Sequence, residues 1–143
     1  MTPLGAHTLV AVGLVGLALN AVWEAVQLRP LYTCWERWTP WQRVLFPLSA
    51  VLGDGVAVVA VAWAAGRLVG AEALTPPGVA GWLVLLGLAL PLAVLLERAA
   101  LALDLWRYRP AMPTARVFGR DVGLAPVAQI TVLPALSVAL TTM

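Results

Sequence analysis

The chain of 143 residues is 62% hydrophobic and only 11% charged, with a formal net charge of +2 at pH 7. This low charge and a mean hydropathy of +0.90 exclude an ordinary soluble domain, in which about a quarter of the residues are charged. The single cysteine, Cys34, excludes an intrachain disulfide. We attribute the small basic excess to membrane topology and therefore expect no nucleic acid partner.

Four apolar segments follow one another along the chain, at about residues 5–28, 46–69, 78–103 and 122–142. Each is about as long as the ~20 residues that a helix needs to cross the hydrocarbon core of a bilayer. The first lacks the positively charged start and the cleavage site of a signal peptide, so we expect it to be retained. The pattern predicts one all-α domain over residues 1–143, a polytopic membrane protein whose four transmembrane helices form an up-down-up-down bundle.

The arginines are unevenly distributed among the connections, and the chain has no lysine. The first and third connections hold seven of the nine arginines: Arg29, Arg37, Arg43, Arg107, Arg109, Arg116 and Arg120. The second connection and both tails hold only Arg67. The positive-inside rule therefore predicts an integral inner (cell) membrane protein with both termini outside and the first and third connections in the cytoplasm.

Three tryptophans lie three residues apart in the first connection, at Trp35, Trp38 and Trp41. This spacing favours a short helix that lies in the membrane interface and places its indole rings at headgroup depth. An aromatic clamp for a substrate is the alternative interpretation.

The first predicted helix carries a polar stripe near its cytoplasmic end. Asn20, Trp23, Glu24 and Gln27 follow the spacing i, i+3, i+4, i+7. This spacing places all four side chains on one face of the helix.

The other three predicted helices carry polar groups at a similar depth. With a rise of about 1.5 Å per residue, Asp54 lies about 12 Å and Gln129 about 10 Å from the cytoplasmic ends of their helices. Glu97 and Arg98 fall in the last turns of the third helix. Because an unpaired charge in hydrocarbon costs about 2.5–3.5 kcal/mol, we expect these groups to meet inside the bundle in a layer that faces the cytoplasm.

This layer supplies the candidate site. The candidate catalytic residues are the three carboxylic acids, Glu24, Asp54 and Glu97. The candidate substrate-binding residues are Asn20, Trp23, Gln27, Arg98, Trp106, Tyr108 and Gln129. Arg98 is expected to orient the acids, and Tyr108 is expected to share the face of Glu97 if the third helix continues that far. A purely structural role, as hydrogen-bonding glue between helices, is the alternative for the amides.

The residue inventory limits the chemistry. The only histidine, His7, lies at the outer end, and the chain has no phosphate loop, nucleophile elbow or cysteine-rich zinc pattern. We expect no cofactor and assign no metal site, although a divalent cation held by the three acids stays open. What remains is general acid–base chemistry on a lipid or isoprenoid-like molecule.

Two further functions stay open: an accessory or assembly subunit of a membrane complex, and a small proton-coupled carrier. The partners to expect are membrane lipids, an apolar small molecule, and either a second copy of this chain or another membrane subunit.

Two stretches resemble known proteins. The run "LWRYRPAMPTARVFGRDVGLAPVAQITVLPAL" is similar to the end of a lycopene-cyclase-type membrane domain, in which an aromatic-rich loop leads through a glycine-containing turn into a proline-bearing helix. The resemblance implies an isoprenoid substrate, but Val127, Ala128 and Gln129 stand after Pro126 where that family carries acidic residues. The run "WEAVQLRPLY" resembles the first helix of small uncharacterised bacterial four-helix membrane proteins, which implies a fold and no activity.

Overall fold

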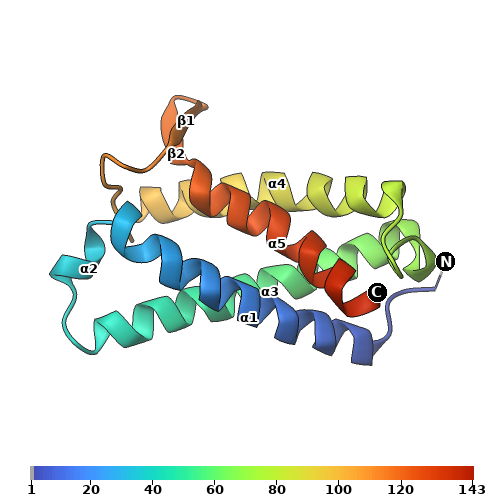
Figure 1. Ribbon diagram of the computed structural model, residues 1–143. Coiled ribbons are helices and arrows are strands. Elements are labelled where there is room, and N and C mark those ends of the chain that lie inside the picture. Colours follow the sequence, from blue (N-terminus) through green and yellow to red (C-terminus); the bar gives the residue numbers. More distant parts are fainter. Residues whose placement is uncertain (1) are drawn as a thin grey trace.

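The computed structural model describes residues 2–143 and is mostly helical (Figure 1). Its elements in chain order are α1 (Ala6–Leu31), α2 (Cys34–Arg37), α3 (Gln42–Val69), the 3-10 turn η1 (Ala71–Ala73), α4 (Val79–Ala102), β1 (Thr114–Val117), β2 (Arg120–Gly123) and α5 (Leu124–Thr142). The helices α1, α3, α4 and α5 are long and apolar enough to cross a membrane. This confirms the prediction of four such helices.

The long helices end close to the predicted limits, with two informative differences. α3 begins one turn earlier than predicted because Thr39 and Gln42 exchange hydrogen bonds between backbone N–H and side-chain oxygen, at 2.9 and 3.4 Å. This is the reciprocal pattern of a capping box, which satisfies backbone donors at a helix start. α4 ends at Ala102, and Asp104 has a φ of 53°, so the helix does not continue to Tyr108.

The third connection contains a β-hairpin, which the sequence pattern did not predict. β1 and β2 are antiparallel, with Thr114 opposite Gly123 and Val117 opposite Arg120. The two residues of the turn, Phe118 and Gly119, have φ values of 47° and 80°. Two positive φ angles are typical of the tight hairpin turn whose twist matches that of the strands.

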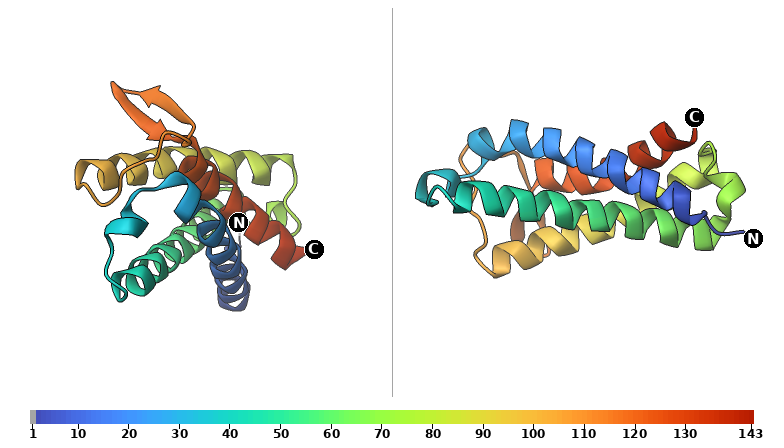
Figure 2. Two further views of the ribbon diagram at one scale, coloured as in Figure 1. Left: turned by 60° about the vertical axis from the view of Figure 1, so that its left-hand side comes forward. Right: turned by 90° about the horizontal axis from the view of Figure 1, so that it is seen from below.

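The four long helices pack along one another. α1 packs mainly against α3 and α5, and α4 packs mainly against α5. Figure 1 shows both termini and the segment around η1 at one end of the molecule, and α2 and the hairpin at the opposite end, which we call the α2 end. Both views in Figure 2 show α3 and α4 farther apart at the α2 end than at the end with the termini.

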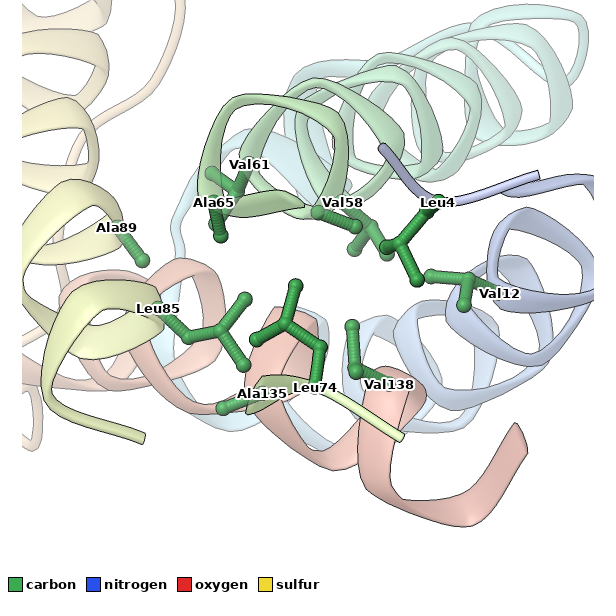
Figure 3. Close-up of a cluster of buried hydrophobic side chains, with 11 residues drawn as sticks. Leu4, Val12, Val58, Val61, Ala65, Leu74, Leu85, Ala89, Ala135 and Val138 are labelled. Carbon is green, nitrogen blue, oxygen red and sulfur yellow. The ribbon is translucent and has the colours of Figure 1, made fainter. Parts of the chain in front are cut away.

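The main apolar core lies in the half of the bundle near the termini. It is built from buried aliphatic side chains of α1, α3, α4 and α5, together with Leu4 and Leu74 from the segments beyond the helix ends. Figure 3 shows these side chains pointing toward one another between the helices. This core contains no ionisable group, and the buried carboxyl and amide side chains of the helices, Asn20, Gln27, Glu97 and Gln129, lie outside it.

Gly81 in the first turn of α4 lies against the backbone of η1. A Cβ atom at Gly81 would lie 2.2 Å from the carbonyl oxygen of Ala73, so an alanine requires a backbone shift. We expect Gly81→Ala to lower the free energy of unfolding by about 1–3 kcal/mol, the usual cost of overpacking. Denaturation in detergent, followed by tryptophan fluorescence, measures this change.

The matched control is Gly87→Ala on the same helix, where a Cβ meets no atom within 4 Å. Because alanine has the better helix propensity, this control should keep or slightly raise stability. Equal losses for the two variants would contradict the close approach of η1 to α4.

Candidate functional site

A cavity of about 590 Å³ lies at the α2 end, between the four long helices. Each of these helices contributes a carboxyl or amide side chain to its wall, and α3 also contributes Ser49: the four are Glu24 from α1, Asp54 from α3, Glu97 from α4 and Gln129 from α5. The rest of the wall is mainly aliphatic and aromatic. The structure therefore brings the three acids predicted as catalytic residues to one cavity.

Gln129 is the centre of the polar network and is only 1% exposed. Its Nε2 donates to Asn20 Oδ1 and Asp54 Oδ2, both at 2.9 Å, and lies 3.3 Å from Glu24 Oε1. Its Oε1 accepts a hydrogen bond of 2.6 Å from Gln27 Nε2. Since an amide nitrogen has two hydrogens, three acceptors share two donors here. One amide of α5 thus holds side chains of both α1 and α3.

The polar face of α1 extends this network. Trp23 Nε1 donates to Gln27 Oε1 at 3.0 Å, and Gln27 Nε2 donates to Glu24 Oε1 at 2.9 Å. Asn20 Nδ2 donates to the carbonyl oxygen of Gly16 at 2.8 Å. The four residues lie on one face, as their spacing predicts, but only Glu24 lines the cavity, and Trp23 reaches the network only through Gln27.

Glu97, which is 4% exposed, is held by the loop that follows α4. Its Oε1 accepts hydrogen bonds from Trp106 Nε1, at 3.1 Å, and from the hydroxyl of Tyr108. The same hydroxyl accepts a hydrogen bond of 2.8 Å from the backbone N–H of Gly123, at the end of β2. Burial, together with the hydrogen bond to Glu97 and its charge, raises the pKa of Tyr108 well above its ordinary value of 10.

Arg98 does not orient the three acids. Its Nη1 donates to the carbonyl oxygens of Val117 and Phe118, at 2.6 and 3.4 Å, and its guanidinium lies 5.8 Å from the centre of the Phe118 ring. Neighbouring residues of a helix point about 100° apart, so Arg98 cannot share the direction of Glu97. Arg98 instead fastens the hairpin turn to α4.

The three tryptophans of the first connection have different environments. Only Trp35 belongs to α2, and the guanidinium groups of Arg29 and Arg43 lie 4.8 and 5.6 Å from its ring centre. Trp38 lines the cavity and packs edge to face against Phe46, whereas Trp41 is 75% exposed. A single short helix therefore does not present all three rings, and Trp38 alone is placed to contact a molecule in the cavity.

Ion pairs and metal-binding groups are not found at the cavity. In the part of the chain that the structure describes, the two ion pairs join Arg107 to Asp104 and Arg109 to Glu36, both outside the cavity. Across residues 2–143, no group of three or more His, Cys, Asp or Glu side chains is arranged to hold a metal ion. The described geometry gives no support to a divalent cation held by the three acids.

Several cavity residues had a signal in the sequence that we did not use. On α4, Ala93 and Ala100 lie at i−4 and i+3 from Glu97 and form part of the wall around it. Tyr32 continues the spacing of four residues that begins at Glu24. Helical periodicity around each acid would therefore have predicted part of the apolar wall.

Comparison of the chain with protein-family models, with curated proteins and with solved structures finds no match. The cavity and its polar network are therefore the basis for any assignment of function.

Proposed function

We propose that this protein spans a cell membrane four times as an up-down-up-down bundle and binds or transforms a lipid or isoprenoid-like molecule in the cavity at the α2 end. The observation that carries the proposal is the wall of this cavity of about 590 Å³, which combines a mainly apolar surface with three acids from three helices. Sites for small molecules typically have this size and this combination. Because ionisable groups are costly inside a membrane, their presence in a spanning helix favours a function.

The route of entry that we propose runs between α3 and α4. Phe46 of α3 and Leu96 of α4 line the cavity and are 44% and 45% exposed, so the cavity wall continues onto the outer surface of the bundle. The two helices diverge at this end (Figure 2). An apolar molecule can therefore pass from the lipid into the cavity without crossing the polar headgroups.

The chemistry that we propose is proton transfer by the carboxyl groups. One protonated acid donates its proton to a double bond or oxygen of the substrate, and a second, ionised acid removes a proton from a substrate carbon. The two acids then exchange protons with water and regain their starting states. Gln129 holds Glu24 and Asp54, while Tyr108 holds Glu97, so the positions of all three acids are fixed.

The orientation that we propose places the α2 end in the cytoplasm of the cell and both termini outside. The seven arginines of the first and third connections support it, because their connections lie at the α2 end in Figure 1. In a Cys34→Ser background, Trp41→Cys should react with a membrane-impermeant maleimide only after the membrane is opened, since this position is 75% exposed. Labelling of intact cells would contradict this orientation.

The test of function is the molecule that the purified protein retains. We expect mass spectrometry of organic extracts to find a lipid or isoprenoid-like compound bound to the wild-type protein, and Glu24→Gln, Asp54→Asn and Glu97→Gln to retain less of it. The matched control is Glu72→Gln, because Glu72 is an exposed acid bonded to Thr2 outside the cavity. Circular dichroism checks that all variants are folded. Equal retention by the wild type and the cavity variants would contradict the proposal.

A second candidate function is a non-catalytic subunit that assembles with other membrane helices. The observation that favours it is the network of Gln129, which joins α5 to α1 and α3 through hydrogen bonds. Such bonds can serve only to stabilise the packing of helices, without any ligand. In this case Glu24→Gln should chiefly lower the yield of an assembled complex, and the amount of lipid in the organic extracts should stay unchanged.

A further inference from the structure

Each of the three cavity acids leaves one carboxylate oxygen unused. Glu24 accepts its hydrogen bonds through Oε1, Asp54 through Oδ2 and Glu97 through Oε1. Within residues 2–143, the second oxygens, Glu24 Oε2, Asp54 Oδ1 and Glu97 Oε2, accept no hydrogen bond, and each keeps some accessible surface. Because all three acids line the cavity, these oxygens are free to accept hydrogen bonds from a molecule inside it.

The cavity wall offers these acids no positive partner. No arginine or histidine is among the described residues that line it, and the ion pairs described above lie outside. A buried acid is stable when it is paired with a cation or hydrogen-bonded at its free oxygens. A ligand with hydrogen-bond donors would satisfy these oxygens, and a positive charge would suit the ionised acids best.

Aromatic side chains line the same cavity. Tyr32 and Trp106 pack edge to face with ring centres 6.0 Å apart, and Trp38 and Phe46 pack in the same way at 5.2 Å. The faces of aromatic rings attract ammonium groups, and cages of aromatic rings are a known way of binding organic cations. This is a second feature of the wall, independent of the acids, that favours a cation.

We propose that the ligand of this cavity is an amphiphilic primary amine, a protonated amino group on a long apolar body. An ammonium group carries hydrogen-bond donors and no acceptor, which suits a wall whose free polar atoms include carboxylate oxygens and whose described residues include no cation. The apolar body lies along the aliphatic wall toward the opening between α3 and α4. This inference rests on the proposed function, because it names the ligand class of the same cavity.

The test compares two amphiphiles that differ only in their head group, with the protein in a neutral detergent. We expect radiolabelled tetradecylamine to bind saturably, and unlabelled tetradecylamine to displace it about tenfold more effectively than tetradecanol. Because each removes one negative charge from the cavity wall, Glu24→Gln, Asp54→Asn and Glu97→Gln should each weaken amine binding, by up to about tenfold, the size expected for one charge-assisted hydrogen bond. Glu72→Gln should bind as the wild type does.

A measurement on the wild-type protein alone guards against variants that fail to fold. Tetradecyltrimethylammonium keeps the positive charge but has no N–H donor, so it should displace the amine less well than tetradecylamine itself. Equal displacement by the amine and the alcohol would overturn this inference and leave the proposed function standing. If neither amphiphile binds saturably and the organic extracts contain no bound lipid, both this inference and the proposed function would be overturned.

Discussion

Replacement of Gln129 by leucine is expected to lower the free energy of unfolding by about 2 kcal/mol. Gln129 is almost fully buried and bonds to Asn20, Gln27, Asp54 and Glu24 through a single amide group. Interhelical hydrogen bonds in membrane proteins contribute about 0.6 kcal/mol each on average. A leucine side chain can form none of the four. Unfolding by sodium dodecyl sulfate in mixed micelles, followed by circular dichroism, measures the difference.

The matched control lies on the same helix. Ser137 is also fully buried, but its hydroxyl donates only to the carbonyl oxygen of Leu133 within α5. Ser137→Ala therefore removes no bond between helices and should change stability by less than about 0.5 kcal/mol. If Gln129→Leu were as stable as Ser137→Ala, the amide would not be the centre of the polar network.

The polar face of α1 shows what could be predicted from the sequence. Helical periodicity alone places Asn20, Glu24 and Gln27 on one side, because a local repeat determines which side chains share a face. Counting residues from the helix ends also gave Asp54 and Gln129 a similar depth. The identity of the hydrogen-bond partners was not predictable in this way, since it depends on how the helices rotate against one another.

The loop after α4 shows the limit of such reasoning. We expected Tyr108 near Glu97 because both would lie on one continuous helix, but α4 ends at Ala102 and the chain turns back to bring the hydroxyl to the acid. The hairpin was missed because its turn has Phe118 at a position where asparagine or glycine is the usual residue. Arg98 was assigned to the acids by its depth alone, although its direction on the helix differs from that of Glu97.

The second large effect that we expect is the suppression of tyrosine ionisation at alkaline pH. The chain has two tyrosines, and both lie beside the site: Tyr32 follows α1 and is 4% exposed, and Tyr108 bonds to Glu97. Burial, with a further contribution from the charge of Glu97, raises the pKa of both hydroxyls above the ordinary value of 10. The folded protein should therefore show little tyrosinate absorbance at pH 10, where tyrosines of the unfolded chain are about half ionised.

The same shift makes stability depend on pH. Because the pKa of each hydroxyl is higher in the folded than in the unfolded chain, the folded chain binds more protons above pH 10. The contribution to stability is complete below pH 10 and is lost as the pH rises toward the folded-state pKa. Tyr108→Phe keeps the ring but removes one of these hydroxyls, so its stability should fall less steeply above pH 10. Tyrosinate absorbance of the folded protein at pH 10 equal to that of the unfolded chain would contradict the enclosure of both tyrosines and the bond from Tyr108 to Glu97.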